Sequence, residues 1–246
     1  MSMQLTILGC YGPYPPAGGA CSGYLVQEED CNLLLDCGNG VLSRLQEFIA
    51  YQDLDAVLLS HLHADHISDL MIMRYGLMQS RKGDSVDHPL PLYTPKEPAE
   101  DFNRLPYKSA YDVRALDELS AFEIGPFKIT VSAGVHAVPV FGFRLESSSG
   151  ILVYSGDTEM NQNIGPFAAA ADLLLCEANY LEEDIAAGLP NHLSAAQAAA
   201  IAAEAGVKKL LLTHLHPERD SSLYLAEAQK LFPAAELARE RFTYTL

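Results

Sequence analysis

The sequence predicts an α/β fold, with α+β character, in which two β-sheets pack together and helices cover their outer faces. Short apolar runs rich in β-branched residues and leucine alternate with turn residues and with segments of helical spacing. In each half of the chain, antiparallel β patterns come first and strand–helix units follow, an order that favours two packed sheets. We find no internal repeat, low-complexity tract or linker, and therefore expect one domain over residues 1–246.

The first half begins with two predicted strands separated by a Gly/Pro-rich loop, and a third strand follows. Apolar residues at helical spacing then predict a helix, a buried strand and a second helix. In order, these are strands 4–8, 24–27 and 32–36, helix 41–51, strand 56–60 and helix 67–79. Residues 80–119 are rich in proline and charge, so we expect them to be irregular, and either a lid or a dimer contact is left open.

From Ala121 onward the β pattern resumes and is then joined by helical segments. An Ala-rich stretch predicts one helix, and a second helix closes the chain. The expected elements are strands 127–132, 140–146, 151–155, 172–176 and 209–213, with helices 194–205 and 222–231.

The composition and net charge exclude some classes of function. Of the 246 residues, 49% are hydrophobic and 20% are charged, which suits a globular protein with a sizeable core. The formal net charge of −16 argues against a protein that binds a nucleic-acid backbone or an anionic membrane with its whole surface. The chain has no apolar run of roughly 18 residues and no signal-peptide pattern, so we expect a cytoplasmic protein without membrane contact.

The cysteines are odd in number and form no C-x-x-C pair, which disfavours both a disulfide scaffold and a zinc ribbon. We expect small buried side chains in a reducing compartment. The five are Cys10, Cys21, Cys31, Cys37 and Cys176.

Seven of the sixteen basic residues fall between positions 74 and 114. They are either ordinary solvated surface or contacts for a substrate phosphate, and the sequence leaves both readings open. The seven are Arg74, Arg81, Lys82, Lys96, Arg104, Lys108 and Arg114.

The strongest motif is H-x-H-x-D-H, which follows a buried strand directly. His61, His63, Asp65 and His66 can converge there because the chain turns instead of extending. Imidazole and carboxylate groups are ligands that zinc and similar metals prefer. The alternative is a polar turn without a metal. Four potential ligands within six positions favour a metal site over this alternative.

Three further candidate ligands follow other predicted strands. His136, Asp157 and His214 each lie on a loop that leaves a sheet edge, where separate loops can meet over one site. Taken singly, each residue suits a cap or a turn. His88 and His216 have no assigned role, although His216 competes with His214 as a ligand.

Together these segments resemble the metallo-β-lactamase superfamily. They occur in family order over nearly the whole chain: Leu34-Leu35-Asp36-Cys37-Gly38 before a helix, the H-x-H-x-D-H motif, His136, Ser-Gly-Asp157-Thr and Thr-His214. The resemblance implies a four-layer αβ/βα sandwich with two divalent metal ions between the sheets, zinc first, with manganese or iron as alternatives. It also implies the ligand sets, namely His61, His63 and His136 for one ion, Asp65, His66 and His214 for the other, and Asp157 bridging both.

Within this superfamily the sequence looks most like the ribonuclease Z-like phosphodiesterase branch. His136-Ala-Val-Pro139 and Asn191-His192-Leu193-Ser194 resemble two of its segments, although Leu193 stands where a small hydroxyl residue is common. The resemblance implies that His192 assists phosphate chemistry. Glu177 is either its orienting partner or an ordinary loop carboxylate. Asp65 would orient the attacking hydroxide or accept its proton.

The resemblance implies a dinuclear hydrolase of small or cyclic phosphodiesters or short RNA, with a hydroxide that bridges the metals as nucleophile. Members that process tRNA carry a long arm between the lone histidine and the bridging aspartate. Only twenty residues separate His136 from Asp157 here, and with the net charge this makes structured tRNA an unexpected substrate. A glyoxalase II-like thioester hydrolase and a non-catalytic metal-binding sensor remain the alternatives, and a homodimer is left open.

Overall fold

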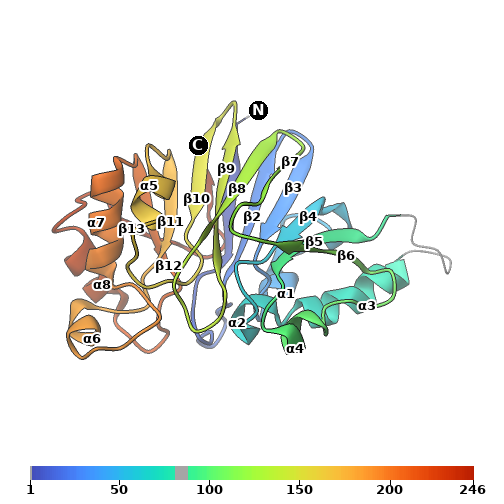
Figure 1. Ribbon diagram of the computed structural model, residues 1–246, viewed down its shortest axis with the longest axis horizontal. Helices are drawn as coiled ribbons and strands as arrows, with labels where there is room; N and C mark the ends of the chain where they lie inside the picture. Colours follow the sequence, from blue (N-terminus) through green and yellow to red (C-terminus); the bar gives the residue numbers. More distant parts are fainter. Residues whose placement is uncertain (1, 81–87) are drawn as a thin grey trace.

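The computed structural model describes residues 2–80 and 88–246. It contains two sheets of seven strands that pack face to face, with helices on both outer sides (Figure 1). Helices α1 to α4 lie outside the first sheet, and α5 to α8 lie outside the second. The four-layer αβ/βα sandwich is therefore confirmed.

In the first sheet, three antiparallel neighbours at the start of the chain are followed by parallel strands. A short strand from residues 243–245 pairs antiparallel with the first strand. In spatial order the strands are β14 (Thr243–Thr245), β1 (Gln4–Gly9), β2 (Gly23–Glu28), β3 (Cys31–Leu35), β4 (Ala56–Leu58), β5 (Leu90–Pro95) and β6 (Tyr111–Leu116).

The second sheet repeats this plan, with an antiparallel meander followed by parallel strands. Both halves of the chain thus show the predicted order of antiparallel strands before strand–helix units. In spatial order the strands are β13 (Glu236–Leu237), β12 (Lys209–Thr213), β11 (Leu173–Glu177), β10 (Gly150–Tyr154), β9 (Phe141–Ser147), β8 (Phe127–Ala133) and β7 (Ala121–Ile124).

The helices are short, apart from two of eleven residues. Ser194 caps the Ala-rich helix α7 by accepting a hydrogen bond from Gln197 N at 3.0 Å. The helices are α1 (Val41–Leu45), α2 (Ala64–Ile67), α3 (Leu70–Ser80), α4 (Ala99–Phe102), α5 (Ile164–Ala168), α6 (Glu182–Ala186), α7 (Ala195–Ala205) and α8 (Ser221–Ala228), with a 3₁₀ turn η1 (Tyr51–Asp53).

The parallel strands are continuously apolar because both of their faces are buried. In β3, Leu33 and Leu35 pack in the core between the sheets, whereas Leu34 packs under the outer helices. In β11, Leu173 and Leu175 face the same central core, and Leu174 packs under the helices of the second sheet. This burial fixes the register of the strands, and it therefore fixes the position at which each strand ends and the chain leaves the sheet.

The expectation of an irregular segment over residues 80–119 is wrong in part, because the segment contains two strands and a helix. Two parallel strands, β5 and β6, extend the first sheet, and α4 connects them. Pro91 and Pro95 hid β5 in the sequence, but β4 pairs only with Leu92 and Tyr93 of this strand. Both prolines are aligned with β6, but like Tyr93, whose carbonyl accepts from Leu59 N, they face the β4 side of the strand. On that side they lie outside the pairing, so a missing N–H breaks no ladder bond. Arg81 and Lys82 lie outside the described residues.

Two predicted helices have different bounds. The helix expected over 41–51 ends at Leu45, because the chain must return through η1 to the start of β4 at Ala56. The helix expected over 67–79 is divided into α2 and α3. The elements α5, α6, β13 and β14, which have two to five residues each, are too short to show a period in the sequence.

All five cysteines are free and buried, as expected for small packed side chains. Among residues 2–80 and 88–246, no helix combines the length and apolar character needed to cross a membrane.

Candidate metal centre

The H-x-H-x-D-H motif occupies the loop after β4 and the first turn of α2. His61 and His66 are fully buried, and the side chain of Asp65 is 12% exposed. Gly38 makes this turn possible, because a Cβ at that position would lie 1.9 Å from the carbonyl oxygen of Asp65.

Three imidazole nitrogens converge on the side of the cluster formed by His61. His63 Nδ1 lies 3.0 Å from His61 Nε2 and 3.1 Å from His136 Nε2. His136 arrives from the loop between β8 and β9, as its position after a predicted strand suggested. These three atoms form one potential metal-ligand group.

A second group forms on the other side, from Asp65, His66 and His214. His214 Nε2 lies 3.1 Å from Asp65 Oδ2, and His66 Nε2 lies 3.6 Å from the same oxygen. His214 directly follows β12 and is 2% exposed.

Asp157 lies between the two groups. Its Oδ2 is 3.2 Å from His214 Nε2, 3.3 Å from His66 Nε2 and 3.9 Å from His61 Nε2. One carboxylate oxygen therefore approaches donors of both groups, the position that a bridging ligand requires.

The donor set fits divalent metal ions of the zinc type. Ligands 2.0–2.1 Å from a tetrahedral ion are about 3.3 Å apart, close to the spacings within both groups. Two buried atoms, His66 Nε2 and Asp157 Oδ1, have no hydrogen-bond partner among the described residues. Buried polar atoms without partners are costly, and metal ligation would satisfy them.

Asp36, at the end of β3, organises the buried side of the cluster. Its carboxylate accepts hydrogen bonds from Ser60 N at 2.7 Å, Ser60 Oγ at 2.8 Å, His66 Nδ1 at 2.8 Å and Tyr154 OH at 2.7 Å. Asp36 has a left-handed backbone, with φ of 56°, a conformation that is strained for a residue other than glycine. Four donors hold this carboxylate in one orientation.

These outer hydrogen bonds leave the inward-facing nitrogens free to bind metal. His66 Nδ1 donates to Asp36, so its Nε2 presents a lone pair to the cluster. His136 Nδ1 donates to the Asn191 carbonyl at 2.8 Å, with the same consequence. Burial holds the pKa of His61 well below its usual range, which keeps that ring neutral.

The N-terminal loop closes over His214. A Cβ on Gly12 would lie 1.8 Å from His214 Nε2, so only glycine fits against this ring. Asn179 joins the two segments by donating from Nδ2 to the Gly12 carbonyl at 3.0 Å and to the His214 carbonyl at 2.9 Å. Like Asp36, His214 has a positive φ, of 56°.

His192 stands beside the cluster with Glu177 behind it. Its ring stacks on His214, with ring centroids 5.2 Å apart, and Glu177 Oε1 accepts a hydrogen bond from His192 Nδ1 at 3.0 Å. Burial opposes the charged ring, but the charge and hydrogen bond of Glu177 outweigh it and raise the pKa of His192 to about 9. Glu177 is buried and also accepts from Thr158 N and Asn179 N.

Other sequence candidates lie away from the cluster. His216 packs edge-on against Tyr14, and its Nδ1 accepts from Glu218 N at 3.3 Å. Neither His216 nor His88 belongs to a metal-ligand group of the described residues. Among the basic residues, Arg74 lies over the ring of Tyr107.

The sequence reasoning named every donor of the cluster but assigned no role to Asp36, Ser60, Tyr154, Asn179 or Gly12. Asp36 had a signal, since it stands at the end of a predicted strand directly before Cys37-Gly38. Tyr154 had none, because its partner lies 118 positions away in sequence.

The site combines seven proposed ligands where strands end with His192, which forms a further potential ligand group with Asp157 and His214. Between two sheets covered by helices, it defines a metallo-hydrolase of the metallo-β-lactamase fold. The chain belongs to the beta-lactamase superfamily, because residues 31–215 match the model of the beta-lactamase superfamily domain.

Individual relatives refine this placement. The chain is 39% identical over 215 residues to the probable metallo-hydrolase YhfI of Bacillus subtilis, covering 87% of each chain. It is 31% identical over 248 residues to a ribonuclease Z of Mycolicibacterium paratuberculosis, covering 87% of this chain and 86% of the relative. The crystal structure of YhfI superposes with a TM-score of 0.92 at 34% identity, over 99% of both chains. Human short-form tRNase Z shares the fold, with a TM-score of 0.76 at 20% identity over 98% of both chains.

Tyr154→Phe tests the hydrogen bond from the second sheet to Asp36. We expect metal affinity to fall about tenfold, because the carboxylate that orients His66 loses one of its four donors. Tyr24→Phe is the matched control, since Tyr24 is equally buried and its hydroxyl pairs with Thr213 Oγ1 instead. Metal titration of both variants measures the difference, and equal losses of affinity would contradict the role of Tyr154.

His214→Ala and His216→Ala separate the two histidines after β12. We expect His214→Ala to bind less metal, because it removes a donor from the second group. We expect His216→Ala to keep its full metal content. Elemental analysis of the purified variants reads this out, and metal loss in His216→Ala alone would reverse the assignment.

Proposed function

We propose that the protein is a dinuclear metal-dependent phosphodiesterase that acts on small or cyclic phosphodiesters or short RNA. The observation that carries the proposal is Asp157 Oδ2, within 4 Å of nitrogens from both ligand groups. On this reading His61, His63 and His136 hold one ion, Asp65, His66 and His214 hold the other, and Asp157 is shared.

Two divalent ions bound here would lower the pKa of water toward about 7 and neutralise the non-bridging oxygens of a phosphate. Asp65 is placed at the mouth of the cluster and can orient the attacking oxygen or take up its proton. Asp36 keeps His66 in place while the charge at the site changes.

His192 is the candidate acid for the leaving alkoxide. Its Nδ1–H donates to Glu177, so its Nε2–H is the group available to an oxygen of the substrate. Glu177 holds the ring in position and favours its charged form. A protonated imidazole next to a phosphodiester can either donate a proton or bind a phosphate oxygen.

Charge and topology favour small substrates. The net charge of −16 repels a long polyanion. Residues 137–156 form only the β9–β10 hairpin and its approaches, which leaves no room for an arm between His136 and Asp157. Relatives named ribonuclease Z and a structural neighbour named as a diphosphatase of the PhnP family support phosphate-ester chemistry.

The test combines metal analysis with a substrate panel on the same protein preparation. Protein loaded with zinc, manganese or iron is assayed with bis(p-nitrophenyl) phosphate, cyclic nucleotides, short RNA, a thioester and a β-lactam. We expect about two ions per chain and turnover of phosphodiesters. Thioester turnover without phosphodiester turnover would overturn the proposal in favour of a glyoxalase II-like enzyme, and metal binding without any turnover would favour a sensor.

His192→Gln tests the proposed acid. We expect kcat to fall by about 10²- to 10⁴-fold, with metal content unchanged, because the variant cannot donate a proton to the leaving oxygen. Glu177→Gln, which keeps a hydrogen-bonding side chain but loses the charge, should give a smaller loss. His216→Gln is the control outside the cluster, and the same decrease in that variant would argue against a specific role for His192.

A further inference from the structure

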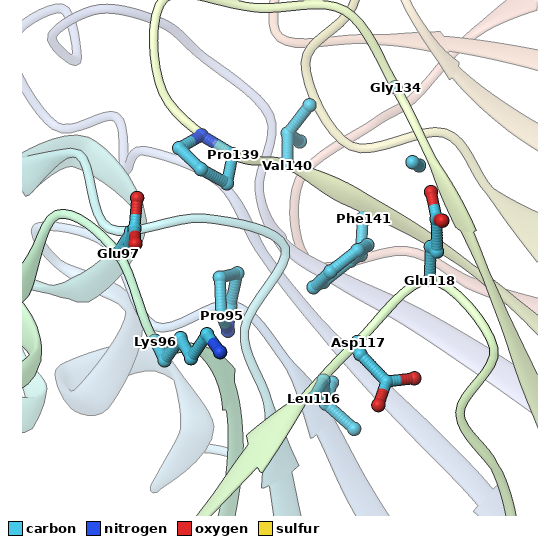
Figure 2. Close-up of a pocket in the computed structure, with 11 residues that line it drawn as sticks. Pro95, Lys96, Glu97, Leu116, Asp117, Glu118, Gly134, Pro139, Val140 and Phe141 are labelled. Atoms are coloured by element: carbon cyan, nitrogen blue, oxygen red, sulfur yellow. The ribbon is translucent and has the colours of Figure 1, made fainter.

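A groove opens where β5, β6 and β8 of the two sheets end and β9 begins (Figure 2). Its volume is about 460 Å³, within the range of small-molecule sites. One wall comes from the residues at and after the end of β5, the opposite wall from the end of β6, and the floor from the start of β9. None of the seven proposed metal ligands lines it.

The floor of the groove is joined to the strand ends that carry the metal-ligand candidates. Phe141 N donates to the carbonyl of Ser60, the residue directly before His61, at 2.9 Å. Val140 packs against Gly156, directly before Asp157, since a Cβ on that glycine would lie 3.1 Å from Val140 Cγ2. The loop that ends in Val140 also carries His136. The floor of the groove therefore lies directly against the residues that precede two of the metal-ligand candidates, His61 and Asp157.

The inner surface of the groove is apolar. Val140 and Phe141 on the floor and Leu116 on the β6 wall are each less than 9% exposed, and Figure 2 shows Phe141 between the two walls. Burying a ring of a ligand against these side chains is favourable in proportion to the apolar area removed from water.

The rim is net negative. Glu97, Asp117 and Glu118 are exposed around the groove, and Lys96 is the one basic residue among its lining residues. Lys96 is also the one described basic residue of the 74–114 segment that lines this groove. Three carboxylates against one ammonium disfavour a second anionic group in a ligand whose phosphate already lies at the cluster.

We propose that this groove binds an uncharged aromatic arm of a phosphate ester, such as a phenyl ring or a nucleobase, and that its acidic rim rejects an arm with a second negative charge. The inference rests on the proposed function, and it narrows the substrate class to esters with a single anionic group. Short RNA, with a phosphate at every step, becomes a poor substrate on this reading.

The test measures binding, so it needs no turnover. Methyl phosphate, phenyl phosphate and 4-carboxyphenyl phosphate are titrated calorimetrically into metal-loaded protein. We expect phenyl phosphate to bind about tenfold more tightly than methyl phosphate, and the added carboxylate to cancel most of that gain.

The double variant Glu97→Lys, Glu118→Lys should raise the affinity for 4-carboxyphenyl phosphate by a larger factor than the affinity for methyl phosphate, because only the former places a carboxylate at the rim. Its matched control is Glu29→Lys, Asp30→Lys, which makes the same charge change at the exposed β2–β3 turn. Equal affinities for methyl and phenyl phosphate, or equal effects of the two double variants, would overturn the inference.

Turnover of bis(p-nitrophenyl) phosphate is measured on the same samples. Turnover without selectivity among the three ligands refutes the groove proposal and keeps the phosphodiesterase. Selective binding without turnover refutes the phosphodiesterase and keeps the groove as a binding site for single-charge phosphate esters.

Discussion

The hydrogen bonding of one buried carboxylate, that of Asp36, organises this molecule. A charged group without exposure is tolerated only when hydrogen bonds replace its water, and Asp36 receives four. Three come from Ser60 and His66 on the loop after β4, and the fourth comes from Tyr154 at the end of β10 in the opposite sheet. The packing of the two sheets and the orientation of the histidine loop are therefore coupled. If either is displaced, the Asp36 carboxylate loses hydrogen bonds that stabilise its buried charge.

The architecture explains why a site assembled from distant segments lies at one edge. A strand with both faces buried is apolar along its length, so polar residues are placed in the loop that follows its last residue. Parallel strands end at the same edge of a sheet, and these loops therefore lie together. The donors follow β4, β8, β10 and β12, from both sheets, and so meet over the seam between them. Gly12 and Asn179 then close the N-terminal loop against His214.

Local sequence signals predicted much of this arrangement. The H-x-H-x-D-H motif and the single polar residues after apolar runs were sufficient to name the seven donors, because strand ends can be read from short patterns. The strand β5 was missed because Pro91 and Pro95 resemble loop residues, and β6 was missed because Asp112 and Arg114 interrupt its apolar pattern. The prolines are tolerated because β4 pairs only with Leu92 and Tyr93. The roles of Asp36 and Tyr154 depend on contacts between residues 118 positions apart, and no local pattern records such a contact. The predicted length of the 41–51 helix was wrong for a related reason. The chain must turn back to reach the start of β4, and this tertiary constraint ends the helix early.

The pairing of β14 with β1 has a consequence for biosynthesis. Residues 243–245 lie beside residues 4–6 in the first sheet, so that sheet stays incomplete until the ribosome has added residues 243–245. The donors are spread from His61 to His214, and a nascent chain that has reached α7 carries the first group without the second. Long-range pairing of this kind slows folding and leaves strand edges open in the meantime. Complete metal loading is therefore a late event, and an interrupted translation product would lack the full donor set.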